Sequence, residues 1–157
     1  MEKRFKNIDF SVSTFSDYGI QIKKKSSYYE SLSYPDKENP KFINIVAEVA
    51  THLSPKDLAS VLIFIEQSLE RKRMKKNDPR TCDIDIIDYN NQIINFKYQD
   101  SDFIVPHKKL IYRNFVLFPL QEISPGWTHP KTNELISILI EKLPQDDKNS
   151  ILKIKES

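Results

Sequence analysis

Two aspartates separated by one residue, Asp83 and Asp85, are the first feature of this sequence that could do chemistry. They alternate with the apolar residues Cys82, Ile84 and Ile86. In a strand this alternation places both carboxylates on one face, about 7 Å apart at ~3.3 Å per residue. Two like charges at that distance repel each other unless a cation lies between them. Hard cations such as Mg²⁺ bind carboxylate and phosphate oxygens together, so the pair predicts a clamp for a metal-bound nucleotide.

A solvated strand face is the alternative interpretation of an isolated Asp-x-Asp pair. The surrounding basic residues favour the metal site, because a bound polyphosphate needs positive groups around it. These residues are Arg71, Arg73 and Arg80 before the pair, and His107 and Arg113 after it. On charge alone, the basic segment 71–80 is equally well read as a solvated loop.

A second pattern could recognise a flat heteroaromatic ring. In the strand predicted from residue 42 onward, Phe42 and Asn44 share one face. An aromatic side chain can stack on such a ring, and an amide can hydrogen-bond to its edge. Packing in the core is the alternative role for a phenylalanine at this position.

Three helices are predicted from apolar residues at helical spacing. The second has the clearest signals, because Ser54 can cap it, Pro55 suits its first turn and Asp57 favours its positive end. The apolar stripes are Phe5, Ile8, Val12 and Phe15, then Leu58, Val61, Leu62, Ile65 and Leu69, and finally Leu135, Ile136, Leu139, Ile140 and Leu143. Gly19 is expected to stop the first helix, and the third is expected to begin near Thr132.

The predicted strands lie between these helices. They cover residues 20–29, 42–49, 82–89 and 92–96, and Asn90-Asn91 forms the turn between the last two. The segments 31–40 and 71–80 are predicted loops, because both are rich in turn residues or prolines.

Composition predicts one domain over residues 1–157, with 145–157 as a frayed tail. Apolar residues make up 39% and charged residues 29%, and no apolar run approaches the ~20 residues that span a bilayer. The single cysteine, Cys82, fits a reducing compartment, and a net charge of +2 argues against a general nucleic-acid binder. We therefore expect a cytoplasmic monomer with no membrane or nucleic-acid partner.

Residues 79–85, Pro-Arg-Thr-Cys-Asp-Ile-Asp, resemble the signature of 6-hydroxymethyl-7,8-dihydropterin pyrophosphokinases. Several ordered motifs over most of a chain are more specific than any one of them. The other matching segments are Ser26-Ser27-Tyr28-Tyr29, Phe42-Ile43-Asn44, Ile65-Glu66 with Arg71-Lys72-Arg73, Val105-Pro106-His107 and residues 113–125. The resemblance runs from near Met1 to about Pro125.

The resemblance implies an α+β fold of ferredoxin-like type, with an antiparallel sheet flanked by helices. The implied reaction transfers diphosphate from ATP to the hydroxymethyl group of a reduced pterin and releases AMP. Asp83 and Asp85 would ligate two Mg²⁺ ions that bridge the ATP phosphates and the attacking oxygen. Nucleotide contacts are implied for Glu66, Arg71, Arg73, Arg80, His107 and Arg113. Arg71 and Arg73 are also implied to be catalytic. Arg73 would lie on a loop that closes over the substrates. Pterin contacts are implied for Ser31, Phe42, Asn44, Asp83 and Phe115, with Phe115 on the ring face opposite Phe42.

The sequence departs from the family pattern in four places. Members usually open with a strand that ends in a Gly-Ser-Asn-Leu-Gly turn, and this sequence starts almost inside the following helix, so the first strand is expected to be absent. Residues 31–34, Ser-Leu-Ser-Tyr, replace a Thr-Pro-Pro type sequence. Ile63 stands where a glutamine is usual, and Asp78 replaces a glycine.

Two alternatives stay open, and the absent first strand supports the first of them. One is a relative that binds pterin, nucleotide or a partner without turnover. The other is a different two-metal enzyme, such as a nucleotidyltransferase, but the sequence lacks the Gly-Ser turn expected before such an aspartate pair.

Overall fold

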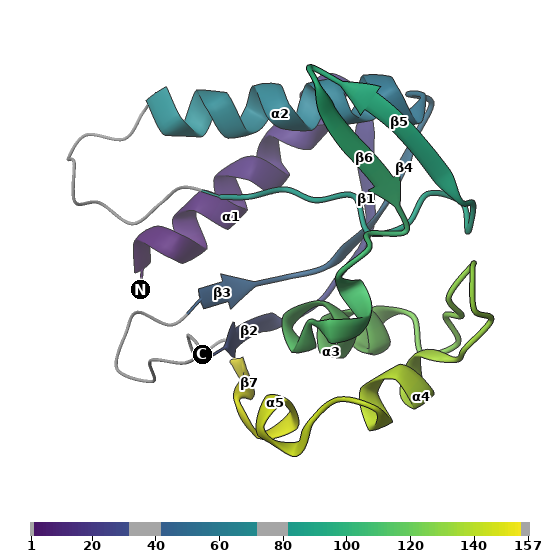
Figure 1. Cartoon of the computed structure of the whole chain (residues 1–157). Helices are drawn as coiled ribbons and strands as arrows, with labels where there is room; N and C mark the ends of the chain where they lie inside the picture. The colour runs from purple at the N-terminus through teal and green to yellow at the C-terminus, as the bar shows by residue number, and fades with distance from the viewer. Residues whose placement is uncertain (1, 32–41, 72–81, 155–157) are drawn as a thin grey trace. The chain divides into compact units, whose positions relative to one another are not determined.

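The computed structural model describes residues 2–31, 42–71 and 82–154 (Figure 1). Helices and antiparallel strand pairs alternate in these ranges, which confirms an α+β protein. The chain divides into two compact units: unit 1 is Met1–Lys23 with Val49–His107, and unit 2 is Lys24–Glu48 with Lys108–Ser157. The prediction of one domain stays a prediction. None of the helices in the described part of the chain has the length and apolar character needed to cross a membrane.

Two helices form the frame of unit 1. Helix α1 (Glu2–Thr14) continues into the 3₁₀ helix η1 (Phe15–Tyr18), and it packs against α2 (Pro55–Arg71) (Figure 1). Gly19 ends the first helical segment with φ of 78°, as its position predicted. The core contains Phe15, Ile20, Leu58, Leu62, Ile65 and Leu69, so the predicted apolar stripe of α2 is the buried one.

The N-terminus of α2 is capped as predicted. The Ser54 hydroxyl oxygen accepts a hydrogen bond from the Asp57 N–H at 3.1 Å, and the Ser54 carbonyl accepts one from the Leu58 N–H at 2.8 Å. The first bond satisfies an N–H group that a helix start otherwise leaves without a partner, and the second is the first backbone bond of the helix itself.

The prediction of a hairpin between 82–89 and 92–96 is wrong. The turn at Asn90 and Asn91 forms, with φ of 53° and 57°, but residues 82–88 lack ladder bonds within the described part of the chain. Instead β5 (Ile94–Tyr98) pairs with β6 (Ser101–Val105). That pairing is favoured by aromatic contacts, since the rings of Phe96 and Phe103 stack at 5.3 Å.

The two strands predicted over 20–29 and 42–49 are each split in two. Strand β1 (Ile20–Lys25) pairs with β4 (Ala47–Thr51), and β2 (Tyr28–Ser31) pairs with β3 (Phe42–Asn44). At the break, the Ser26 N–H donates to the Val46 carbonyl at 2.9 Å, and the Val46 N–H donates to the Ser26 hydroxyl at 3.0 Å. A side-chain oxygen here takes the place of a backbone acceptor, which interrupts both strands at the same level.

Unit 2 contains a three-stranded antiparallel sheet in the order β3-β2-β7, where β7 is Ile151–Ile154. Its helices are η2 (Leu110–Tyr112), α3 (Asn114–Ile123), α4 (Ile136–Glu141) and α5 (Gln145–Asn149). Helix α3 contacts β2. The predicted start of the last long helix near Thr132 is wrong, because the His129 N–H donates to the Glu134 carbonyl and Asn133 has φ of 61°. These contacts close a turn just before α4 begins.

Residues 145–154 are held in the fold, in place of the frayed tail expected over 145–157. Strand β7 pairs with β2, and the side-chain amide of buried Asn114 donates to the Asp147 carbonyl at 2.7 Å and the Ser150 hydroxyl at 3.2 Å. The polar segment that was expected to fray therefore supplies hydrogen-bond partners to Asn114 of α3 and to the backbone of β2.

We expect Asn114→Asp to destabilise unit 2, because a carboxylate of the same shape cannot donate to the Asp147 carbonyl. Loss of a buried hydrogen bond costs about 1–3 kcal/mol, which urea denaturation measures. The exposed Asn149, which accepts a bond from Gln145, is the matched control, and Asn149→Ala should change stability by less than about 0.5 kcal/mol. Equal effects of both substitutions would show that Asn114 does not anchor the C-terminal segment.

Candidate functional site

The alternation predicted around the two aspartates is present, although residues 82–88 form no ladder hydrogen bonds with the other residues that the structure describes. Cys82, Ile84 and Ile86 pack against the core of unit 1, whereas Asp83 and Asp85 are exposed. Burial of every second residue leaves the two carboxylates on the side that faces solvent. Both carboxylates therefore lie on the solvent side, as the predicted metal clamp would require.

Glu66 of α2 fixes the backbone between the two aspartates. Its Oε1 accepts a hydrogen bond from the Ile84 N–H at 2.6 Å. The resemblance assigned Glu66 to the nucleotide, and the structure gives it this additional contact, which sequence reasoning missed. A carboxylate acceptor makes a stronger bond than a neutral one, and here it replaces a ladder partner.

Cys82 does not take part as a thiolate. Burial is the largest influence on its thiol, and with the nearby Asp83 and Glu66 carboxylates it raises the pKa of Cys82 to about 11, against an opposing hydrogen bond with Ser11. The thiol is therefore protonated at neutral pH and serves as an apolar anchor for the segment.

The donor set suits Mg²⁺ and leaves most of the coordination to other ligands. Within 2–31, 42–71 and 82–154, no group of three or more His, Cys, Asp or Glu residues could hold a metal ion. Mg²⁺ in nucleotide sites commonly binds one or two carboxylates, with phosphates and waters completing the octahedron. The exposed pair fits that chemistry.

The structure describes some, but not all, of the basic residues that are predicted to bind the nucleotide. In unit 1, Arg71 is the exposed last residue of α2, and the His107 N–H donates to the Ile87 carbonyl at 3.0 Å. His107 is thereby tied to the end of the segment that carries the aspartates. Arg73 and Arg80, with the predicted closing loop, lie outside the described residues.

The predicted pterin residues of the sheet in unit 2 share one face. In the ladder Asn44 lies opposite Tyr29, and Phe42 lies opposite Ser31, so these four side chains point to the same side. Phe42 is 59% exposed, which excludes the core-packing alternative for this residue. Ser31 is buried between Phe42 and Ile151 in the ladder.

Helix α3 carries the remaining predicted residues of unit 2. The Arg113 guanidinium, just before the helix, lies over the Phe115 ring at 5.3 Å. Phe115 itself is half-buried in the first turn. The face of an aromatic ring that holds a guanidinium can also hold a flat heteroaromatic ring.

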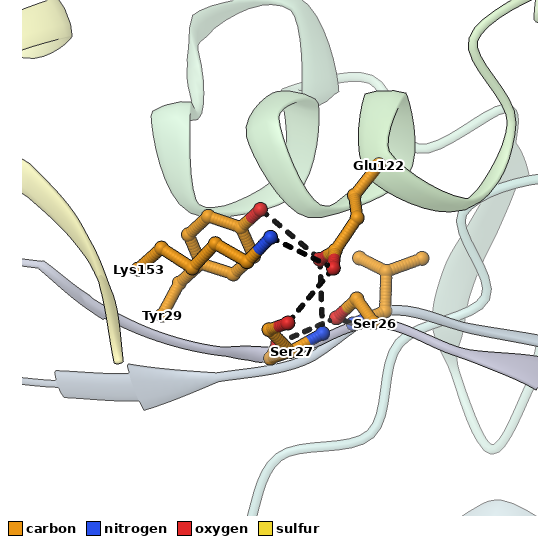
Figure 2. A network of polar contacts seen from close by, with 6 residues as sticks. Ser26, Ser27, Tyr29, Glu122 and Lys153 are labelled. Carbon is orange, nitrogen blue, oxygen red and sulfur yellow. Dashed lines mark hydrogen bonds and ion pairs between the residues drawn. The ribbon is translucent and has the colours of Figure 1, made fainter. Parts of the chain in front are cut away.

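A carboxylate at the other end of α3 forms a cluster of polar contacts in unit 2, and sequence reasoning missed it. Glu122 is contacted by Ser27, Tyr29 and Lys153, as Figure 2 shows. We call these four residues the Glu122 network. Both Glu122 and the serine-tyrosine run lie in motifs that carried the resemblance, but nothing in the sequence connected the two motifs to each other.

Within the Glu122 network, the Glu122 carboxyl is ionised and the Tyr29 hydroxyl is neutral at physiological pH. Burial raises the pKa of Glu122, but hydrogen bonds from Ser27, Tyr29 and Lys153 outweigh it and hold the pKa below its ordinary value. Burial, followed by the hydrogen bond and charge of Glu122, raises the pKa of Tyr29 to about 12. Tyr29 therefore keeps its proton and donates to an ionised Glu122.

Known proteins match this chain over most of its length. The family model for 7,8-dihydro-6-hydroxymethylpterin-pyrophosphokinase (HPPK) matches residues 1–125. The 2-amino-4-hydroxy-6-hydroxymethyldihydropteridine pyrophosphokinase of Synechocystis sp. is 36% identical over 125 residues, which cover 80% of this chain and 62% of the relative. The enzyme of the same name from Aquifex aeolicus is 35% identical over 111 residues, which cover 71% of this chain and 67% of the relative.

A longer relative matches as well. The folic acid synthesis protein fol1 of Pneumocystis carinii is 36% identical over 149 residues, which cover 95% of this chain and 20% of the relative. The chain thus spans between a fifth and two thirds of these three relatives. Since the family model covers most of the sequence, including the exposed aspartate pair and the residues Phe42, Asn44 and Phe115, the chain belongs to the 7,8-dihydro-6-hydroxymethylpterin-pyrophosphokinase family.

Proposed function

We propose that this protein transfers diphosphate from ATP to 6-hydroxymethyl-7,8-dihydropterin, giving AMP and the pterin diphosphate for folate synthesis. The observation that carries the proposal is the exposed Asp83 and Asp85 pair on a segment whose other face is buried. The names of the matched relatives, which are pyrophosphokinases of the same pterin, support it.

The proposed metal ligands are Asp83 and Asp85, holding two Mg²⁺ ions. Bound magnesium would neutralise phosphate charge as it develops during transfer. Asp83 would also lie close to the pterin substrate. Glu66 would contribute by holding the Ile84 backbone, so that the two carboxylates stay on the solvent side.

The proposed reaction is an in-line displacement at the β-phosphorus of ATP. The hydroxymethyl oxygen forms a new bond to this phosphorus and loses its proton to solvent, the bond from the β-phosphorus to the oxygen of the α-phosphate breaks, and AMP leaves with that oxygen. Such reactions depend on positioning and charge neutralisation. Arg71, Arg73, Arg80, His107 and Arg113 would supply positive charge to the nucleotide, with Arg71 and Arg73 acting on the transferred group.

Ring recognition would fall to residues of unit 2. Phe42 and Phe115 would stack on the pterin, Asn44 would hydrogen-bond to its edge, and Ser31 would lie beside Phe42. The shared sheet face of Phe42 and Asn44 supports this assignment.

The proposal extends to a ferredoxin-like sheet arrangement, a monomeric state and a cytoplasmic location. The antiparallel pairing in unit 2 and the family membership support the first. The single cysteine, which cannot form an internal disulfide, supports a reducing compartment.

The direct test incubates the protein with ATP, Mg²⁺ and 6-hydroxymethyl-7,8-dihydropterin and identifies the nucleotide product. AMP formation that requires the pterin would support the proposal. ADP as the product, or nucleotide incorporation without pterin, would indicate another enzyme. Pterin binding without any product would indicate a relative that binds and does not turn over.

We expect Asp85→Ala to reduce AMP formation by at least about 100-fold, because one metal ligand is lost from a pair. The fold should persist, since the carboxylate is exposed and exposed side-chain contacts contribute little to stability. Asp102→Ala, which removes an exposed carboxylate from β6 of the same unit, should leave the rate unchanged. Activity of Asp85→Ala within a few fold of the wild type would refute its assignment as a ligand.

We expect Phe42→Ala and Asn44→Ala each to weaken pterin binding roughly tenfold, with little effect on an ATP analogue. The reason is that both residues face the ring and neither is assigned to the nucleotide. Leu152→Ala is the matched control, because Leu152 is 66% exposed and pairs with Glu30 on the opposite face of the same sheet. Fluorescence titration measures both affinities, and equal losses for the two ligands would show general unfolding instead.

A further inference from the structure

We propose that Glu122 is a positioning residue for pterin binding, which holds α3 against the sheet face that carries Phe42 and Asn44. The inference rests on the proposed function, because it concerns the same ring-binding residues. Glu122 itself is not required to touch the ring.

Each oxygen of Glu122 accepts bonds from more than one donor. Its Oε1 accepts from the Ser27 N–H at 2.9 Å and the Tyr29 hydroxyl at 3.0 Å, and its Oε2 accepts from the Ser27 hydroxyl at 2.8 Å. The Lys153 Nζ lies 3.3 Å from the same Oε2. In Figure 2 the side chain reaches from the helix to Tyr29 and Lys153 on the strands and to Ser27 just before β2. A carboxylate with this many donors has one strongly preferred position.

On the helix side, Glu122 and Phe115 project from the same face of α3. They are seven residues apart in a helix that runs over Asn114–Ile123. Seven residues are nearly two full turns at about 3.6 residues per turn, so the two side chains lie one above the other. Fixing Glu122 against β2 therefore fixes the direction in which Phe115 points.

On the sheet side, the network acts on the strand next to β3. Tyr29 lies opposite Asn44 in the β2-β3 ladder, and Ser26, one residue before Ser27, is bonded in both directions to Val46. A shift of β2 away from α3 would carry Asn44 and Phe42 with it. The Glu122 network thus sets the separation between Phe115 on the helix and Phe42 and Asn44 on the sheet.

Strand β7 also contributes a residue to the Glu122 network. Lys153 of β7 lies opposite Tyr29 in the β2-β7 ladder, on the same face as Asn44. Lys153 lies after residues 1–125, the part of the chain that the family model matches. Lys153 adds a positive charge to the carboxylate, and β7 covers the edge of β2 that β3 leaves open.

A stacked ring tolerates little error in the distance between its two aromatic partners, so a positioning role has a specific signature. Loss of the network should weaken pterin binding and leave nucleotide binding unchanged. A role in stability alone would lower the melting temperature and weaken both ligands to the same extent.

The experiment measures the affinity of the whole chain for 6-hydroxymethylpterin, by its fluorescence, and for a non-hydrolysable ATP analogue with Mg²⁺. We expect Glu122→Ala to weaken pterin binding by roughly tenfold or more, with the ATP analogue bound within about threefold of wild type. Glu122→Gln keeps one acceptor oxygen and loses the charge, so its loss should be intermediate. Glu134→Gln is the matched control, because it removes the charge of a half-buried carboxylate that pairs with Lys142 in the same unit.

Tyr29→Phe and Lys153→Met provide tests that do not depend on the folding of Glu122→Ala. Each removes one donor from Glu122, keeps the bulk of the side chain, and should weaken pterin binding by a few fold. Unchanged pterin affinity in both variants, or equal losses for pterin and ATP analogue in Glu122→Ala, would overturn the inference. Wild-type protein that binds no pterin would instead refute the proposed function, so the two failures are distinguishable.

Discussion

The exposed position of Asp83 and Asp85 depends on how Ile84, the residue between them, is anchored to unit 1. Ile84 packs against the core of unit 1, and its N–H donates to Glu66 at 2.6 Å. One apolar contact and one charge-assisted bond therefore fix the residue between the carboxylates, without a sheet ladder in the described part of the chain. Since neighbouring side chains of an extended segment point in opposite directions, this anchoring turns both aspartates toward solvent.

The same device occurs in unit 2 with different residues. Glu122 of α3 accepts the Ser27 N–H at 2.9 Å, as Glu66 of α2 accepts the Ile84 N–H. In each case a helix supplies a carboxylate acceptor to an extended segment whose neighbours are proposed to bind substrate. A carboxylate suits this task, because its bonds are stronger and more directional than those of neutral acceptors. Both units thus hold proposed substrate-binding segments by electrostatics as well as by apolar packing.

Local patterns in the sequence predicted what local physics decides. The alternation around Ile84, the cap at Ser54 and the left-handed Gly19 are confirmed, since each depends on a few adjacent residues. Pairing between distant segments could not be predicted in this way. The pairing of β7 with β2 joins residues more than 100 positions apart, and the split at Ser26 depends on a hydroxyl that replaces a backbone acceptor. The contacts of Glu66 and Glu122 were missed for the same reason.

The most direct measurement of the central claim is the position of the metal relative to the anchored segment. Mn²⁺ binds carboxylate and phosphate oxygens as Mg²⁺ does, and it broadens the NMR signals of nearby amides. With an ATP analogue present, the amide signals of Asp83, Ile84 and Asp85 should broaden first, and an Asp83→Asn, Asp85→Asn double variant should lose this effect. Sharp signals for these three amides, with broadening centred elsewhere in the chain, would contradict the account.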